Sequence, residues 1–229
     1  MGTMRKKVDY SKIRGFNYTQ SSARSDYEFW KKYDHKMVDR EMGFAQRLNL
    51  NSARIFLNYQ VYLEDKEVYL ERVRDFVQTA WSHGISTNPI LFNGFRFLGE
   101  TDEELSAEPG QLKPLARTVE DPSCWHLGEV YIDDMIAAIG AEPGLLFWDI
   151  ANEYSDDFVT WYEDEPEYLE EFSTRPDMKE LREKQEKTWN LVRHFCSYVR
   201  AKDPEHELGV GNIFIFETDP SGTAPLVDV

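Results

Sequence analysis

Short apolar runs alternate along the chain with longer segments in which apolar residues recur every three or four positions. Residues 66–83 show this helical spacing most clearly, and Gly84 follows them as a helix stop. The same criterion predicts helices over residues 39–50, 128–140 and 178–201. Runs typical of strands lie between these segments, at residues 13–18, 52–57, 85–92, 145–150 and 207–216, with a final strand-like run at 224–229.

This alternation predicts βαβ units, and therefore a parallel sheet with right-handed crossovers. Counting the segments gives about five βα units and a sixth strand, which we expect to form a single α/β domain over residues 1–229. Two long segments without a clear period interrupt the alternation, at about 93–127 and 153–177. Loops of this length in a compact domain are usually functional or mobile.

The apolar run at residues 145–150 ends abruptly in polar residues. Asn152 and Glu153 stand where this strand is expected to stop. Parallel α/β folds place their reacting groups at the carboxyl ends of strands, so these two residues are the first candidates for a functional site. A polar loop that merely follows a buried strand is the alternative interpretation.

The chain of 229 residues has 26 basic and 42 acidic side chains, a net charge of −16. Nucleic acids and anionic membrane surfaces would repel such a protein, so we expect neither as a partner. No apolar stretch follows the basic start of the sequence, so no signal peptide is expected, and the location is either the cytoplasm or, after trimming of a leader, outside the cell. Cys124 and Cys196 lie far apart and are expected to be free thiols.

The sequence lacks the motifs of several common functional sites. Neither of the glycine-rich nucleotide-binding patterns is present, and no serine-hydrolase elbow occurs. The five histidines show no metal-ligand spacing. We therefore expect neither a metal nor a cofactor.

The segments Arg-Gly-Phe-Asn-Tyr, Asn-Ser-Ala-Arg-Ile-Phe-Leu-Asn-Tyr, Pro-Ile-Leu-Phe and Trp-Asp-Ile-Ala-Asn-Glu stand at the first four expected strands. In this order the chain resembles the retaining (β/α)8-barrel glycoside hydrolases of the clan that includes cellulases, mannanases and β-galactosidases. The resemblance covers nearly the whole chain, and its most specific element is the fourth strand ending in Asn-Glu. It implies a TIM-type barrel and hydrolysis of β-linked glycosides.

The same resemblance assigns roles to three residues. Glu153 would be the general acid/base that protonates the leaving oxygen, and Asn152 would hydrogen-bond the sugar 2-hydroxyl. Such contacts strengthen as the oxocarbenium-like transition state forms. Arg54 would match the arginine on strand two that orients the nucleophile and keeps it ionised. A salt bridge between Arg54 and a structural carboxylate is the alternative.

The chain departs from the clan pattern at the nucleophile. A retaining enzyme needs a second carboxylate about 5–5.5 Å from the first, and the clan supplies it from strand seven. With only about six strands, this sequence has no counterpart, so we expect an incomplete barrel. Glu217 could substitute, although a loop carboxylate or a substrate contact is its alternative role, and Asp149 is better explained as the partner of a buried arginine or a backbone amide.

Further residues are candidates for substrate contacts because they close strands or fall in the two long loops. Asn17 closes the first strand, and Trp125 and Tyr154 lie in the loops that follow strands three and four. Aromatic rings stack on the C–H face of a sugar, although such loops also need aromatic residues for their own packing.

An open six-stranded parallel sheet would expose one face and two unpaired edges. We therefore expect self-association, or a second chain, to cover this surface. Three functions remain open from the sequence: a glycoside hydrolase whose nucleophile is missing from this chain, an inactive partial barrel that binds carbohydrate or assembles with another chain, and a barrel lyase or isomerase that uses Glu153 as a base.

Overall fold

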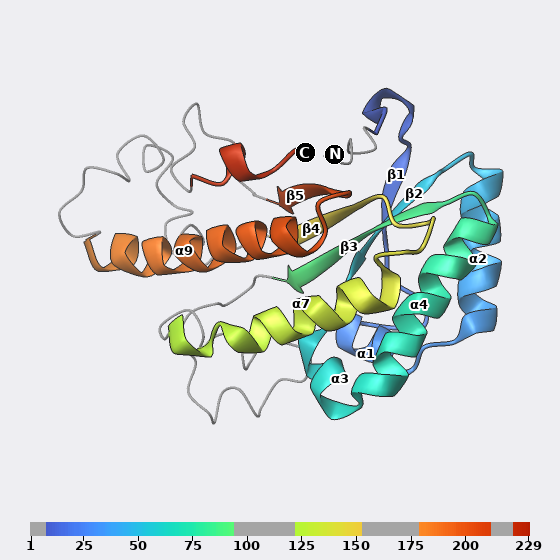
Figure 1. The fold of residues 1–229 in the computed structure, drawn as a ribbon. Helices are drawn as coiled ribbons and strands as arrows, with labels where there is room; N and C mark the ends of the chain where they lie inside the picture. The colour runs from blue at the N-terminus through green and yellow to red at the C-terminus, as the bar shows by residue number, and fades with distance from the viewer. Residues whose placement is uncertain (1–7, 94–121, 153–178, 212–221) are drawn as a thin grey trace, which may run out of the picture.

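The computed structural model describes residues 8–93, 122–152, 179–211 and 222–229. These residues form a sheet of five parallel strands that follow one another in the order of the sequence (Figure 1). The strands are β1 (Gly15–Tyr18), β2 (Ser52–Phe56), β3 (Ser86–Asn93), β4 (Phe147–Asn152) and β5 (Glu207–Gly211).

The helices lie between successive strands. They are α1 (Asp26–Lys31), α2 (His35–Arg47), α3 (Tyr59–Glu64), α4 (Lys66–Ser82), α7 (His126–Ile139) and α9 (Lys179–Lys202), with 3₁₀ turns η1 (Tyr10–Lys12), η2 (Pro122–Cys124) and η6 (Ala224–Leu226). The helices α4, α7 and α9 cover one face of the sheet (Figure 1). A sequential strand order with helices on a single face is the arrangement of a barrel, whereas a doubly wound sheet carries helices on both faces.

Local signals in the sequence set the ends of the best-predicted helix. The Asp65 side chain accepts a hydrogen bond from the amide of Val68 and so caps the start of α4. Gly84 has a φ angle of +73°, the left-handed conformation that ends helices at low cost for glycine. The prediction of a helix over residues 66–83 is confirmed.

The two six-residue helices, α1 and α3, were not predicted, because they are too short to show a period. The residues that cap these helices are nevertheless of the types that favour a helix start. Ser25 and Asn58 each accept a hydrogen bond from the backbone amide three residues ahead.

The prediction of a sixth strand at residues 224–229 is wrong. This segment forms the turn η6, and the amides of Asp228 and Val229 then donate to the carbonyl of Leu208 at 2.8 and 3.1 Å. Pro225 favours the turn because it has no backbone N–H, and Arg200 holds the turn by donating to the carbonyl of Leu226. The described residues thus contain four βα units and a fifth strand. The predicted end of that strand, and most of the two long loops, lie outside the described residues.

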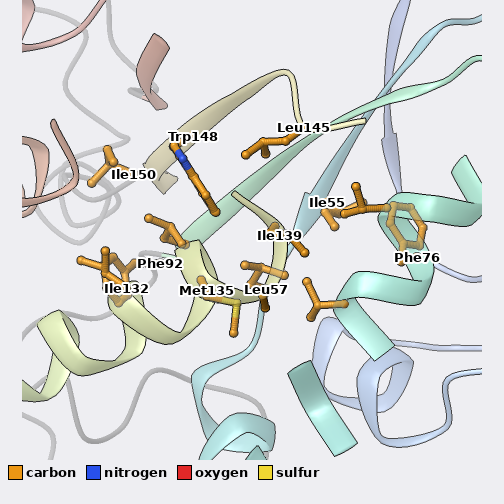
Figure 2. Close-up of a cluster of buried hydrophobic side chains, with 14 of the residues drawn as sticks. Ile55, Leu57, Phe76, Phe92, Ile132, Met135, Ile139, Leu145, Trp148 and Ile150 are labelled. Atoms are coloured by element: carbon orange, nitrogen blue, oxygen red, sulfur yellow. The ribbon is translucent and has the colours of Figure 1, made fainter. Parts of the chain in front are cut away.

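The core fills the space between the sheet and the helices. Figure 2 shows side chains from β2, β3 and β4 meeting those of α4 and α7. Full burial of one such side chain contributes roughly 1.5–3 kcal/mol. The largest side chains of this core include Trp148, Phe76, Phe92, Ile55 and Met42, all at most 1% exposed.

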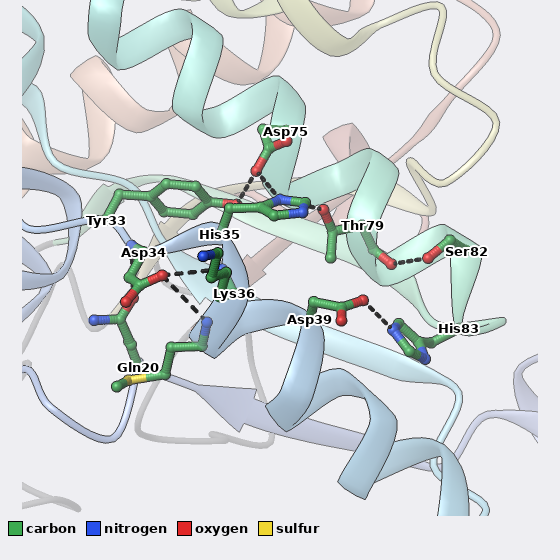
Figure 3. A network of polar contacts seen from close by, with 11 residues as sticks. Gln20, Tyr33, Asp34, His35, Lys36, Asp39, Asp75, Thr79, Ser82 and His83 are labelled. Atoms are coloured by element: carbon green, nitrogen blue, oxygen red, sulfur yellow. Dashed lines mark hydrogen bonds and ion pairs between the residues drawn. The ribbon is translucent and has the colours of Figure 1, made fainter.

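Polar contacts join α2 to α4 on the outer surface. Tyr33 donates to Asp75 at 2.6 Å, and His35 lies 2.9 Å from the same carboxylate oxygen. At the other end of the pair, His83 lies 2.8 Å from Asp39 (Figure 3). Because most of these groups are substantially exposed, their contribution to stability is small, and the apolar interface decides the packing.

A buried polar contact fixes β4 against the end of α9. The indole N–H of Trp148 donates to Asp203 at 2.9 Å, and the His206 ring lies 2.8 Å from the same oxygen. Burial raises the pKa of Asp203, but the hydrogen bonds from His206 and Trp148 outweigh it and lower the pKa from 3.8 to about 2.

We expect Gly128→Ala to lower the free energy of unfolding by about 1–3 kcal/mol, the usual cost of overfilling a packed site. An added Cβ at position 128 would overlap the buried ring of Phe195. Gly43→Ala is the matched control, because the nearest atom to its Cβ would be 3.6 Å away. Helix propensity there predicts a gain of about 0.5–1 kcal/mol. Urea unfolding measures both, and equal stabilities for the two variants would contradict this packing of α7 on α9.

The Asp203 contact also predicts a pH dependence. A lowered pKa stabilises the fold when the group is ionised, so this stabilisation is present above pH 3.8 and disappears as the pH falls towards 2. Asp203→Asn should therefore destabilise the protein at pH 7, and the difference from wild type should shrink over that interval. Urea unfolding at several pH values measures it, and a difference that stays constant down to pH 2 would count against the pairing.

Candidate active site

The carboxyl ends of the parallel strands meet at one edge of the sheet. Asn93 is the last residue of β3 and Asn152 the last of β4, while Asn58 follows β2 by two residues. Asp26 begins α1, the first helix after β1. Polar side chains from four consecutive βα connections are thus gathered along this edge, as expected for the reactive side of such a fold.

Arg54, inside β2, connects this edge to β4. Its Nε donates to Asp149 Oδ2 at 2.8 Å, and its Nη2 lies 2.7 Å from the same oxygen. Nη2 also donates to Asn152 Oδ1 at 2.9 Å. The guanidinium therefore fixes two side chains of β4 at once. The structure pairs Asp149 with an arginine, as suggested, but the Arg54 side chain is partly exposed. This ion pair is also the alternative role that the sequence left open for Arg54.

An irregularity in β4 makes this double contact possible. Residues three apart in a regular strand point to opposite faces. The pairing of β4 with β5 shifts register between Asp149 and Asn152, and both side chains reach Arg54. Bulges of this kind are frequent next to active sites, where they redirect a side chain.

The guanidinium of Arg54 also lies close to the backbone of β5. A Cβ on Gly211 would lie 2.8 Å from Arg54 Nη2, so glycine leaves room there for the guanidinium. Asp149 is 4% exposed, and its burial raises the pKa of the carboxyl, while the charge of Arg54 opposes that increase. Removal of Arg54 would leave the buried Asp149 carboxylate without a counter-charge.

A second group of contacts extends from Asn152 to the other strands. The Nδ2 group of Asn152 donates to Asn93 Oδ1 at 3.3 Å. The amide of Asn58 donates to Asp26 over 3.1 Å. Burial raises the pKa of Asp26, and hydrogen-bond donors, with Asn58 the largest of them, lower it in part. Hydrogen bonds therefore connect Asp149, Arg54, Asn152 and Asn93, and a separate hydrogen bond joins Asn58 to Asp26.

The structure brings together some of the residues selected from the sequence. Arg54 and Asn152 are in direct contact. Asn17 pairs with Arg54 in the register of β1 and β2, and both line a pocket on the face of the sheet opposite the helices. Trp125 is packed elsewhere, with its ring centroid 4.6 Å from that of His194 on α9.

Glu153, Tyr154 and Glu217 lie outside the described residues, so their roles stay predictions. Sequence reasoning missed Asp26, Asn58 and Asn93. Asn93 closes β3 and Asn58 caps α3, and those positions were the available signal, whereas Asp26 is the first residue of α1.

No group of three or more His, Cys, Asp or Glu side chains within the described ranges could hold a metal ion. In the same ranges, no helix is long and apolar enough to cross a bilayer. Cys196 is a buried free thiol, as predicted.

No protein-family model matches the sequence, and no curated protein matches it either. Solved structures do match the fold. The GH5_18 protein from Streptomyces cattleya, solved in complex with GlcNAc, superimposes with a TM-score of 0.60 at 15% identity, over 88% of this chain and 44% of that one. The exo-β-1,4-mannosidase Op5Man5 from Opitutaceae bacterium strain TAV5 gives 0.59 at 15% identity, over 90% and 35%.

A third match is the endo-1,4-β-D-mannanase from Thermotoga petrophila RKU-1, with a TM-score of 0.55 at 14% identity, over 91% of this chain and 57% of that one. The chain therefore spans about half the length of the structures it matches, or less. At such low identities the likeness establishes the fold, and the prediction of an incomplete barrel is confirmed. This chain has the architecture of part of the (β/α) barrel found in GH5 mannosidases and mannanases.

Proposed function

We propose that this chain carries the acid/base side of a glycoside hydrolase site that acts on β-linked glycosides with retention. Glu153 is the general acid/base, and Asn152 donates a hydrogen bond to a hydroxyl of the sugar. The observation that carries the proposal is the contact of Arg54 with Asn152 at the carboxyl end of β4, directly before Glu153 in the chain.

The chemistry requires a proton donor beside the scissile bond, because a glycosidic oxygen leaves poorly until it is protonated. A neighbouring amide that holds a sugar hydroxyl stabilises the transition state as positive charge develops on the ring. Asn152 is suited to this task because it is 5% exposed and its oxygen already accepts from Arg54. Preorganisation of this kind removes an ordering cost from the reaction.

β-Mannosides are the first substrates to test. Three of the matched structures are described as a GH5_18 protein with Manβ1-4GlcNAc, an exo-β-1,4-mannosidase and an endo-1,4-β-mannanase. The charge of −16 is compatible with such neutral ligands, which it neither attracts nor repels.

The nucleophile of the retaining reaction would come from a carboxylate outside the described residues, on this chain or another. Asp149 is poorly suited to the role, since its carboxylate is buried and bound by Arg54. Carbohydrate binding without turnover is the second candidate function. It is favoured because Asp149 is held by Arg54 and is therefore not available as a nucleophile.

The test compares wild type with Glu153→Gln on aryl β-mannosides and aryl β-glucosides. We expect wild type to hydrolyse one of them, and the variant to lose roughly 10²–10⁴-fold in kcat/KM, the usual contribution of a positioned acid/base. Initial rates of aryl release measure the effect.

Glu142→Gln is the matched control. Glu142 lies in the turn before β4, at the opposite edge of the sheet, and accepts a hydrogen bond from Gln78. Its substitution should leave the rate unchanged. If folded wild type and Glu153→Gln are equally inactive but bind β-1,4-mannobiose, the binding function replaces the hydrolytic one. Absence of both binding and hydrolysis would refute both functions.

A further inference from the structure

Strand β5 stands at one end of the strand order, with β4 on one side and no further strand of the described residues on the other. Such an edge offers backbone N–H and C=O groups to which a strand of another chain can add. In this structure the turn η6 and the residues after it run alongside β5 (Figure 1). Residues 226–229 therefore lie where a sixth strand would pair.

Three hydrogen bonds join this segment to Leu208, the second residue of β5. The amides of Asp228 and Val229 donate to the Leu208 carbonyl at 2.8 and 3.1 Å. In the opposite direction, the Leu208 amide donates to Asp228 Oδ2 at 3.1 Å. A carbonyl oxygen has two lone pairs and an amide has one proton, so the backbone of Leu208 has no capacity left for a neighbouring strand.

Arg200, in the last turn of α9, holds the segment in place. Its Nη2 donates to the Leu226 carbonyl at 3.2 Å and to Asp228 Oδ2. Its Nη1 donates to the carbonyl of His206, the residue before β5, at 3.4 Å. One guanidinium thus binds both the segment and the start of the strand that the segment covers. Its ion pair with Asp228 is partly buried and is therefore screened less than one on the open surface.

Apolar contacts add to these polar ones. Leu226 and Val227 are partly buried and pack against the hydrophobic core. The Cβ of Val229 is 3.6 Å from the position that a Cβ at Gly209 would take, so Val229 lies directly over the backbone of β5. The segment is therefore anchored to the strand by side chains as well as by backbone hydrogen bonds.

We propose that residues 226–229 are an edge cap, which keeps a second copy of this chain from adding a strand to β5. The sequence leads us to expect another chain on the open edges of the sheet, and the cap removes this edge from those available. A strand adds to β5 only after the cap has moved away and the hydrogen bonds of Leu208 have been broken. Many proteins protect an edge strand with a covering segment in this way.

The test is Asp228→Ala, which removes the carboxylate that Leu208 and Arg200 share. Hydrogen exchange of the Leu208 amide measures the cap directly, and we expect it to be roughly tenfold faster in the variant, the size of one net hydrogen bond. Sedimentation velocity over a series of concentrations measures association. The variant should form dimers at lower protein concentrations than wild type does.

Asp133→Ala is the matched control, because it removes the same charge and also breaks an ion pair with α9. Asp133, on α7, lies 2.9 Å from Lys202 Nζ and makes none of the contacts of the cap among the described residues. This variant should exchange at Leu208 and associate as wild type does. Asp228→Asn keeps an acceptor oxygen for the Leu208 amide, so it should retain more protection than Asp228→Ala.

If Asp228→Ala does not fold, Val229→Pro replaces it, because proline lacks the N–H that donates to Leu208 and leaves the Asp228 carboxylate in place. Val229→Pro should likewise dimerise at lower concentrations than wild type. Unchanged exchange of Leu208 in folded Asp228→Ala would overturn the proposal. Association of the folded cap variants no stronger than that of Asp133→Ala would also overturn it, since the contact between copies would then lie on another surface.

Discussion

The contact of Arg54 with β4 determines much of this structure. One guanidinium holds Asp149 within the sheet and Asn152 at its edge, so it joins the structural and the candidate functional parts of β4. The buried carboxylate of Asp149 depends on this partner, because a buried charge is costly without a fixed counter-charge. The irregular register of β4 and the glycine at position 211 both accommodate this one side chain.

A rigid sheet makes that contact precise. Large side chains such as Trp148 and Phe92 pack the sheet against the helices. The opposite face carries polar residues, among them Asn17, Arg54 and Asn88, next to apolar ones such as Phe147. Because the strands cannot slide without disturbing this packing, the groups at their carboxyl ends keep fixed separations. Amides and carboxylates, which are short side chains, can then meet across neighbouring strands.

Much of this could be predicted from the sequence, for physical reasons that differ from element to element. The helix α4 has a clear period and strong signals at both ends, so its bounds were predicted almost to the residue. Asn152 was found because it stands at the end of a predicted strand, and Arg54 because the resemblance to the glycoside hydrolase clan points to an arginine on the second strand. The end of the chain was predicted wrongly, because an apolar run favours a strand while Pro225 and a distant arginine impose a turn.

The finer features of the site could not be predicted in the same way. The orientation of an asparagine amide depends on neighbours brought together by the fold, and for Asn152 these are Arg54 and Asn93 on two other strands. The shift of register in β4 likewise has no local signature. Sequence reasoning thus located the strand end that matters and missed the network that holds it.

The order of the strands also bears on how the site is made. Arg54, Asn93, Asp149 and Asn152, which hydrogen bonds connect, all lie on β2, β3 and β4, before α9 and β5 in the chain. Synthesis proceeds from the N-terminus, and early segments can begin to fold while later ones are still being made. The ribosome therefore synthesises all of these residues before α9 and β5, the helix and strand that pack against β4.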